Sequence, residues 1–350
     1  MIDRLRTVPE RAQKRSRKGV PGGQALPMYN VRPATPADLE DAIELIARLQ
    51  ADPAHLIAYH GDTAEEVAEE LAGLRPDWAS GAAVALDRHG RLRGVLSVEA
   101  DPEQHRAYLY GPYVDVPANH PAAGQLWQAT ADALFDLAAG LPRMTGVTRL
   151  DMFGHRQNRL LADFAARRDV TSHSTTRLFT LTGAELRALL VRAADEAPPA
   201  GDRVSPLPED PAVRAAVARL HDRCFPNAPT SGGQLVAAES EYTVVVLRGN
   251  GGLLGYAAGY AQAQEYYVDV VGVDPGYRSL GAGRLLVRRL LSELAARAGA
   301  RNRAAAIIRL GNDASERMFT ALGFSLTLEL VSYSKTDYRP AAAPLTQPSP

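Results

Sequence analysis

The sequence predicts an α/β fold of the α+β type, with two tandem domains that each contain a mixed, mostly antiparallel sheet flanked by helices. Three observations point to it. The chain has 350 residues, which exceeds the usual size of one domain, on the order of 150 residues. Short apolar segments of strand type alternate with longer segments of helical period. Finally, the order strand, helix, hairpin, strand, helix occurs twice along the chain.

The first domain is expected over residues 29–190, where residues 29–39 predict a short strand that leads into a helix. Apolar residues then recur at the three- and four-residue spacing of one helix face. A turn at residues 89–90 separates two apolar segments and predicts a hairpin. The expected elements are, in order, the helix with Leu39, Ile43, Leu45, Ile46 and Leu49, strands at 82–86, 94–98 and 108–116, and a helix at 124–137.

The same plan is expected again in a second domain over residues 203–338. A linker at residues 191–202 precedes it, where Pro, Ala and acidic residues gather. The expected elements are, in order, a strand at 203–207, a helix at 211–224, hairpin strands at 242–247 and 254–261, a strand at 267–273 with a helix after it, a strand at 304–310, a helix from 312, and a closing strand at 325–333.

The two ends of the chain are expected to be disordered. Residues 1–28 carry seven Lys and Arg and show no sustained apolar period. Residues 339–350 are rich in Pro and Ala. Neither segment can bury enough apolar surface to offset the entropy lost on ordering.

Overall composition narrows the classes of function. The formal net charge of −1 and the isoelectric point near 6.7 argue against broad attraction to nucleic acid or to anionic lipid. No run of about 18 apolar residues occurs, so a membrane span is not expected. The single cysteine, Cys224, excludes a disulfide framework within the chain and fits a reducing, cytoplasmic compartment.

A glycine-rich turn follows the apolar strand at residues 267–273. After Asp274-Pro275-Gly276-Tyr277 the chain reads Arg278-Ser279-Leu280-Gly281-Ala282-Gly283-Arg284 and continues with a helical pattern. Glycines let the backbone approach a bulky anion without a Cβ in the way. The first N–H groups of a helix and its positive dipole end favour negative charge. The turn is therefore predicted to bind a pyrophosphate, although it lacks the pattern of a P-loop or of a dinucleotide fingerprint.

Two ordered motifs give this half of the chain a family resemblance. Arg-x-x-Gly-x-Gly after a strand that ends in Val-x-Pro resembles motif A of the GNAT superfamily of N-acyltransferases. Residues 312–324 read Asn-Asp-Ala-Ser-Glu-Arg-Met-Phe-Thr-Ala-Leu-Gly-Phe and are similar to motif B of the same superfamily. The repeated plan resembles the tandem GNAT arrangement of mycothiol synthase.

The resemblance implies that the second domain binds acetyl-CoA as a thioester co-substrate and needs no metal. In this superfamily the motif A strand pairs with the pantetheine arm, and one of its backbone N–H groups stabilises the oxyanion. Asn312 is also open to a plainer interpretation as a residue of the helix start. The residues expected to contact the coenzyme are Val271, Gly272, Val273, Arg278, Ser279, Leu280, Gly281, Ala282, Gly283, Arg284, Asn312, Ser315 and Phe319.

Two acidic residues on the motif A strand are candidates for the catalytic base. Strand alternation is expected to place Asp269 on the same face as Val271 and Val273, with Glu265 farther along it. A carboxylate there can accept the proton of an attacking ammonium group. Each has a structural alternative: Asp269 as a buried, hydrogen-bonded carboxylate, and Glu265 as a solvated residue at the start of the strand.

Phe319 departs from the motif B pattern, which usually has a Tyr whose hydroxyl protonates the departing thiolate. Three interpretations remain open. The thiolate leaves without a dedicated acid, which is tolerable because a thiol has a pKa of about 8.5. Ser315, Tyr277 or Tyr333 takes the place of the missing hydroxyl. In the third interpretation, the domain binds acyl-CoA without transferring the acyl group.

The first domain carries a degenerate counterpart of motif A at residues 116–125. His120 stands at the Arg or Gln position, and Ala123 and Gln125 stand at the two small positions. Pro121 removes a donor N–H group. This half is expected to have lost pyrophosphate binding and to serve as a scaffold.

The predicted function is transfer of an acetyl group from acetyl-CoA to the amine of a small molecule by direct attack on the thioester. Two alternatives stay open: a regulatory module that binds acyl-CoA without catalysis, and an acetyltransferase for proteins or peptides. No nucleic-acid or membrane partner is expected, and the sequence leaves the oligomeric state open.

Overall fold

The computed structural model describes residues 29–339 except 62, 118, 196–202, 227 and 229. The basic segment 1–28, most of the expected linker and all but Arg339 of the expected C-terminal tail lie outside this part. The described chain divides into two compact units. We call residues 176–329 the C-terminal unit, and residues up to 175 together with those from 330 onward the N-terminal unit.

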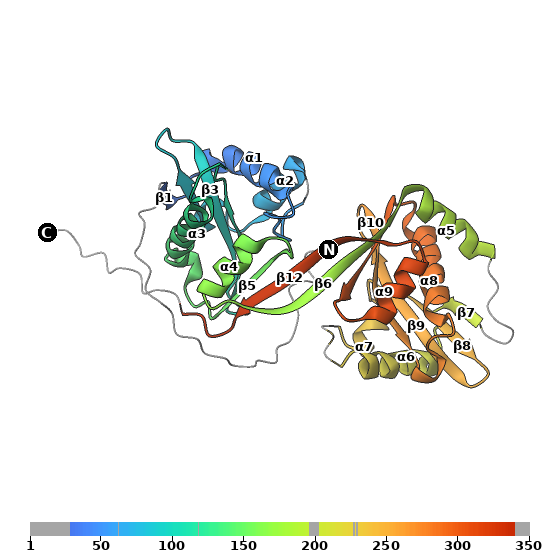
Figure 1. The fold of residues 1–350 in the computed structure, drawn as a ribbon. Coiled ribbons are helices and arrows are strands. Elements are labelled where there is room, and N and C mark those ends of the chain that lie inside the picture. Colours follow the sequence, from blue (N-terminus) through green and yellow to red (C-terminus); the bar gives the residue numbers. More distant parts are fainter. Residues whose placement is uncertain are drawn as a thin grey trace. The chain divides into compact units, whose positions relative to one another are not determined.

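The N-terminal unit contains a mixed sheet with helices packed against it (Figure 1). Neighbouring strands are antiparallel except β4 and β5, which run parallel. Its strands, in their order across the sheet, are β1 (Asn30–Pro33), β2 (Ala82–Leu86), β3 (Leu92–Asp101), β4 (Arg106–Val114) and β5 (Arg149–His155). Its helices are α1 (Leu39–Gln50), α2 (Ala64–Gly73), α3 (Ala123–Ala139) and α4 (Arg159–Arg167), with 3-10 turns η2 (Pro36–Asp38), η3 (Ala79–Gly81) and η4 (Pro142–Met144).

The C-terminal unit repeats this plan. β7, β8, β9 and β10 are antiparallel neighbours, and β10 runs parallel to β11. Its strands are β7 (Arg203–Pro206), β8 (Thr243–Gly249), β9 (Gly252–Ala261), β10 (Glu265–Val273) and β11 (Arg303–Arg309). Its helices are α5 (Gly183–Asp195), α6 (Pro211–Cys224), α7 (Gly232–Leu235), α8 (Ala282–Ala298) and α9 (Asp313–Ala321), with the 3-10 turn η5 (Pro275–Tyr277).

Two long strands, β6 (Thr171–Thr182) and β12 (Ser325–Lys335), contribute to both units. Residues 176–182 of β6 pair with β11 in the C-terminal unit. Residues 330–335 of β12 pair with β5 in the N-terminal unit. Each unit therefore includes a strand segment that the sequence assigns to the other predicted domain. The domain bounds predicted from sequence assign these segments differently and stay predictions.

The sheet of the C-terminal unit has an apolar core on each face. One core joins β8, β9, β10 and β11 to α8 through residues such as Val245, Val268 and Leu290. The other joins the opposite face to α6 and α7 through residues such as Val217, Val246 and Tyr256. These faces follow from strand alternation, because successive side chains point to opposite sides of a sheet. The predicted fold class is confirmed.

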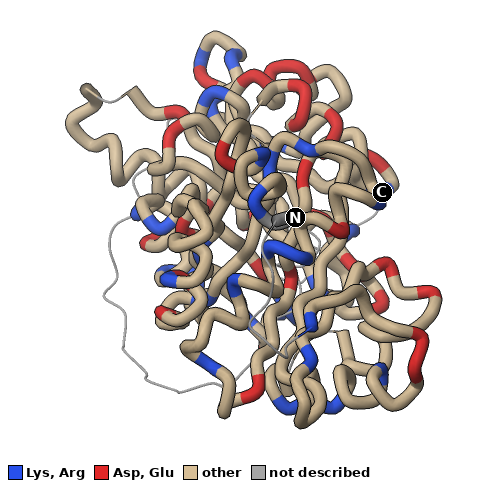
Figure 2. The backbone as a smooth tube through the Cα atoms, turned by 90° about the vertical axis from the view of Figure 1, so that its right-hand side faces the viewer, with Lys and Arg blue, Asp and Glu red and all other residues tan. Residues whose placement is uncertain are grey.

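Charged side chains of both signs are spread along the chain, and blue and red segments occur throughout the view in Figure 2. Within the described ranges, no helix combines the length and apolar character needed to cross a bilayer. Those ranges also hold no group of three or more His, Cys, Asp or Glu side chains placed to bind a metal ion.

Candidate active site

The parallel strands β10 and β11 pair over only part of their length. Their ladder runs from Glu265 opposite Arg303 to Val268 opposite Ala306. Beyond it β10 stays paired with β9 to Val273, and β11 stays paired with β6 to Arg309. The two strands therefore separate, and residues 269–273 have a backbone edge that β11 does not occupy. Such an edge can pair with an extended ligand in the manner of an added strand.

A β-bulge lies at the point where the strands separate. Val268 pairs with Gly259, whereas Val270 pairs with Ala258, so Asp269 is an extra residue in β10. A bulge breaks the alternation of side chains and bends the strand. Consequently, Val271 and Val273 pack with the core under α8, while Val270 packs on the α6 and α7 face. The expectation that Asp269 shares a face with Val271 and Val273 was wrong, because alternation assumes a regular strand.

The carboxylate of Asp269 is held by a tyrosine of the α6 and α7 face. The Tyr242 hydroxyl donates a hydrogen bond of 2.7 Å to its Oδ2 atom. The Tyr242 ring lies edge-on to Tyr260 at 5.7 Å, and Tyr260 lies 5.3 Å from Tyr267. Asp269 is half-buried. A carboxylate beside aromatic rings suits a positively charged amine, which both groups attract.

Glu265 occupies a different environment from Asp269. Its side chain is almost fully buried, and its Oε2 atom forms an ion pair of 2.7 Å with Nε of Arg303. It lies neither in solvent at the strand start nor on the separated part of β10. Glu265 stabilises the paired end of β10 and β11 through this ion pair, and its predicted role as a second base gains no support from its position.

A buried hydrogen-bond chain lies behind the separated edge. His221 Nε2 is 2.9 Å from the Thr230 carbonyl oxygen, and Nδ1 is 2.7 Å from the Tyr256 hydroxyl. Since a carbonyl only accepts, Nε2 carries a proton, and the Tyr256 hydroxyl shares the second hydrogen bond with Nδ1. Burial raises the pKa of the Tyr256 phenol well above its usual range. The neutral phenol is thus the stable form.

The ring of Tyr256 fixes the residue type at Gly272. A Cβ atom at Gly272 would lie 2.4 Å from Cε1 of this ring, which no real side chain permits. The predicted coenzyme-contact residue Gly272 is therefore required by packing against Tyr256. The sequence motifs did not point to Tyr242 or Tyr256, because these residues come from other strands and reach the site only through sheet pairing.

The glycine-rich turn has the backbone conformation of a helix start without a side-chain cap. Ser279 and Gly281 have φ values of 66° and 87°. Gly281 is the N-cap residue of α8 and provides no side chain to the first N–H groups of the helix. Leu280 is 73% exposed, and Arg278 donates through Nε to the Val273 carbonyl oxygen at 3.1 Å. The turn thus presents unshielded N–H groups at the positive end of α8, as an anion site requires.

Gly283 has a packing role that the motif did not reveal. A Cβ atom there would lie 2.5 Å from the Met318 sulfur on α9. This glycine therefore permits close packing of α8 and α9. Ala282 and Arg284 begin the helix beside it, and Arg284 is exposed.

The motif B residues have structural partners. Asn312 is the N-cap of α9, and its side chain accepts from the Ser315 backbone N–H at 3.3 Å. This agrees with the plainer interpretation of Asn312. Phe319 is 4% exposed and packs edge-on to Phe324 at 5.0 Å within the core under α8. Its ring is a core residue, so the predicted coenzyme contact of its side chain is not supported.

The candidates for the missing acid differ in their surroundings. Tyr277 is 41% exposed at the glycine-rich turn. Ser315 is half-buried in the first turn of α9. Tyr333 lies on the segment of β12 that pairs with β5 in the N-terminal unit.

In the N-terminal unit, the corresponding strands also separate, but a segment of the chain fills the gap. β4 and β5 pair only from Arg106 opposite Arg149 to Tyr108 opposite Asp151. Beyond this point Ile57 forms an antiparallel bridge with Gly154. Backbone hydrogen bonds link Ala58 to Phe153 at 3.1 Å and His155 to Leu56 at 3.0 Å. We call residues 56–60 the plug.

Side chains fix the plug in place. Buried Gln50 donates to the carbonyl oxygens of Ile57 and His60 and accepts from the Ile57 N–H group, at 2.7–3.0 Å. Tyr59 is 1% exposed and stacks on Tyr110 of β4 at 4.6 Å. Its ring also meets Phe153 of β5 edge-on at 5.6 Å. The plug therefore contacts both strands where they part.

Comparison with known proteins places the C-terminal half in a family. The sequence pattern of the acetyltransferase (GNAT) family matches residues 214–324. A search of curated proteins found no match. Among solved structures, the chain is similar over 90% of its length to 97% of a GCN5-related N-acetyltransferase from Sphaerobacter thermophilus, at 17% identity and a TM-score of 0.55.

Two further solved structures match at lower similarity. A tandem GNAT protein from the clavulanic acid biosynthesis pathway matches 89% of this chain and 99% of its own, at 16% identity and a TM-score of 0.48. A GCN5-related N-acetyltransferase from Kribbella flavida matches 69% of this chain and 86% of its own, at 17% identity and a TM-score of 0.43. Residues 214–324 are therefore a segment of the acetyltransferase (GNAT) type, and the fold of the chain is similar to that of a GCN5-related N-acetyltransferase.

Proposed function

We propose that the C-terminal unit transfers an acetyl group from acetyl-CoA to the amine of a small molecule by direct attack on the thioester. The observation that carries the proposal is the bulge at Asp269, which coincides with the separation of β10 from β11. It puts a half-buried carboxylate beside a backbone edge that can hold an extended thioester arm.

The residues that fit acetyl-CoA come from two segments. The start of α8 at residues 279–284 offers N–H groups and positive dipole charge to the pyrophosphate. The free edge of β10 at residues 270–273 offers backbone hydrogen bonds to the pantetheine arm. When bound, the thioester supplies the activated acetyl group, and a backbone N–H of this edge would stabilise the charge that develops on its oxygen.

Asp269 is the proposed base. An alkylamine whose ammonium form has a pKa of about 10.4 is neutral in only about one molecule in 10³ at pH 7. Forming the neutral amine therefore costs about 4.6 kcal/mol of free energy. A carboxylate within reach of the amine can accept this proton, directly or through water. Tyr242 positions the carboxylate by its hydrogen bond of 2.7 Å, and the rings of Tyr260 and Tyr267 favour the cationic acceptor before it loses its proton.

Only the C-terminal unit is proposed to bind the coenzyme. In the N-terminal unit the plug occupies the place where β4 and β5 separate. At the start of α3, His120 Nδ1 accepts from the Ala122 N–H at 3.2 Å. Both observations support the loss of binding predicted from residues 116–125.

Titration calorimetry of the full chain with acetyl-CoA tests this function. We expect one site, and we expect Gly281→Val to lose binding because a β-branched residue neither adopts its φ of 87° nor leaves room for a phosphate. Gly299→Val is the matched control: Gly299 ends the same helix with a φ of 75° and open space around it, so it carries the same strain without touching the turn.

Each other outcome has a definite meaning. Two sites would show that the plug does not block the N-terminal unit, and no site would overturn the proposed function. Equal loss of binding in both variants would assign the effect to strain. A panel of amines and peptides, followed by thiol release, then separates the small-molecule proposal from a peptide acetyltransferase. Binding without any turnover would instead support a regulatory module.

A further inference from the structure

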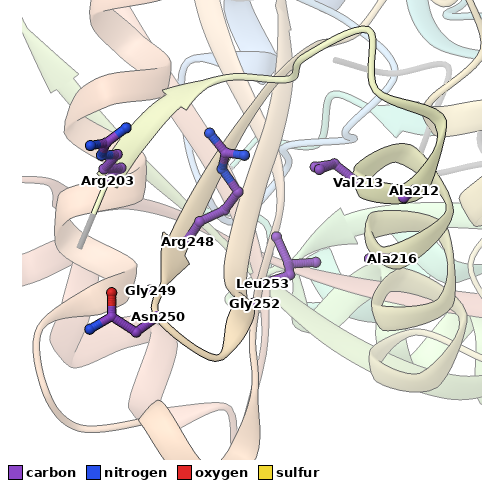
Figure 3. Close-up of a pocket in the computed structure, with 9 residues that line it drawn as sticks. All are labelled: Arg203, Ala212, Val213, Ala216, Arg248, Gly249, Asn250, Gly252 and Leu253. Atoms are coloured by element: carbon purple, nitrogen blue, oxygen red, sulfur yellow. The ribbon is translucent and has the colours of Figure 1, made fainter. Parts of the chain in front are cut away.

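A cavity lies in the C-terminal unit on the face of the sheet that packs against α6. It has a volume of about 750 Å³, within the range of small-molecule sites. Figure 3 shows Arg203 and Arg248 on adjacent strands, with Val213 and Ala216 on α6 across from Leu253. None of the nine described residues that line it is acidic. The cavity thus combines two guanidinium groups with an apolar wall.

The two arginines are directly opposite each other in the sheet. Arg203 of β7 pairs with Arg248 of β8 in the antiparallel register. Side chains at such positions have Cβ atoms about 4.5–5.5 Å apart, and like charges there destabilise the sheet. No ion pair to either arginine is present among the described residues. The Nε atom of Arg248 is buried without a hydrogen-bond partner in the same part of the chain. A buried charged donor without an acceptor is costly unless a ligand pairs with it.

This cavity is separate from the acyl-transfer site. Tyr242, which holds Asp269, precedes β8, whereas Arg248 is near its end. At about 3.3 Å per residue, the two are roughly 20 Å apart along the strand. The glycine-rich turn belongs to α8, which packs on the opposite face. The cavity shares no residue with the Tyr242–Asp269 pair or with the glycine-rich turn.

We propose that this cavity binds a small organic anion whose carboxylate or phosphate group lies between Arg203 and Arg248 and whose apolar part contacts Val213 and Leu253. The planar guanidinium group donates two parallel hydrogen bonds to either kind of oxyanion. An anion between the two arginines removes their mutual repulsion and gives the buried Nε atom of Arg248 an acceptor. The proposal does not depend on the acyl-transfer activity.

Titration calorimetry with two probes, inorganic phosphate and butyrate, tests the proposal at an ionic strength fixed with potassium chloride. We expect saturable binding of at least one probe, and the better probe identifies the anionic group. Arg203→Gln and Arg248→Gln should each weaken binding by about 10- to 100-fold, the usual value of a hydrogen bond to a charged group. The affinity for phosphate bound at the start of α8 would not change in these variants. Weaker binding in them therefore shows that the probe binds in the cavity.

Arg219→Gln is the matched control, because Arg219 is an exposed arginine on α6 and its loss changes the net charge equally. It should leave both affinities unchanged. Arg203 is exposed as well, so its substitution keeps the test valid if Arg248→Gln folds poorly. Absence of saturable binding, or equal weakening by Arg219→Gln, overturns the proposal.

Without a probe, Arg203→Gln should leave the melting temperature unchanged or raise it, since the repulsion between Arg203 and Arg248 is removed. A lower melting temperature would point to a structural role and count against it.

Discussion

Asp269 occupies its position because β10 has one residue more than its partner strand at that point. The bulge turns the carboxylate away from Val271 and Val273 and toward Tyr242. Without the bulge, the alternation set by Val271 and Val273 would place Asp269 in the core under α8, where a charged group without a partner is strongly disfavoured. The bulge therefore allows one short strand to supply both an apolar face and a polar group at its free edge.

Asp269→Asn should lower kcat/KM at pH 7 by about 10²- to 10⁴-fold, because an amide cannot accept the proton of the attacking amine. The deficit should shrink as pH rises toward the amine pKa of about 10.4, where the acceptor is already neutral. Steady-state rates across pH check this, together with the affinity for acetyl-CoA, which should not change.

Glu265→Gln is the comparison variant for Asp269. Since Glu265 is paired with Arg303, its loss should lower the melting temperature and leave the shape of the pH profile as it is. If Glu265→Gln, rather than Asp269→Asn, lowered kcat/KM in the pH-dependent way described above, the assignment of Asp269 as the base would be wrong.

At this scale the sequence predicted residue types better than their surroundings. Asp269 was selected as a candidate from strand and motif, but the bulge that orients it has no clear sequence signal. Phe319 was correctly noted as a departure from the pattern, yet its burial against Phe324 depends on the packing of α8 and α9. Tyr242 and Tyr256 could not be selected, since only sheet pairing brings residues so distant in sequence beside β10.

At the scale of elements, both units contain a pair of parallel strands that separate after a few residues. In the C-terminal unit, no described strand or loop pairs with the edge of β10 at residues 270–273. In the N-terminal unit, Leu56 and Ala58 pair with the free edge of β5. The sequence predicted the strands and the degenerate turn at residues 116–125. It did not predict the plug, because residues 56–60 have no strand or helix pattern of their own.

Gln50→Ala should destabilise the N-terminal unit by about 3 kcal/mol or more. The side-chain amide of Gln50 is buried and satisfies the N–H and C=O groups of Ile57 and the carbonyl of His60. Each buried polar group left without a partner costs about 1–3 kcal/mol. Denaturant unfolding of the full chain measures the change.

Gln157→Ala serves as the control for Gln50→Ala. The Gln157 side chain is exposed in the turn before α4, so this substitution should change the unfolding free energy by less than about 0.5 kcal/mol. Similar stabilities for the two variants would mean that the plug is not held by its hydrogen bonds to Gln50.

At the scale of the whole chain, the two predicted domains exchange strand segments. The segment of β6 at residues 176–182 pairs with β11, and the segment of β12 at residues 330–335 pairs with β5. The sequence predicted two copies of one plan in tandem, which the architecture confirms. It could not predict the exchange, because local patterns identify a strand without giving its partner.

Two fragments test the importance of the exchange for the C-terminal unit. A fragment of residues 176–329 keeps the β6 segment, whereas a fragment of residues 203–338 follows the predicted domain boundary and loses it. We expect the first to unfold cooperatively and to bind acetyl-CoA, and the second to be poorly folded because β11 then has an exposed edge. Circular dichroism melting and acetyl-CoA titration compare them. Equal stability of the two fragments would show that the exchanged segment is dispensable and would favour the predicted boundary.

The exchange also has a genetic consequence. A premature stop codon directly after Glu329 would leave the whole family match at residues 214–324 intact. It would nevertheless remove residues 330–335, which pair with Leu150–His155 in the N-terminal unit. A stop codon at this point would therefore damage the N-terminal unit, which is encoded upstream of it, and its severity would be underestimated from the position of the codon alone.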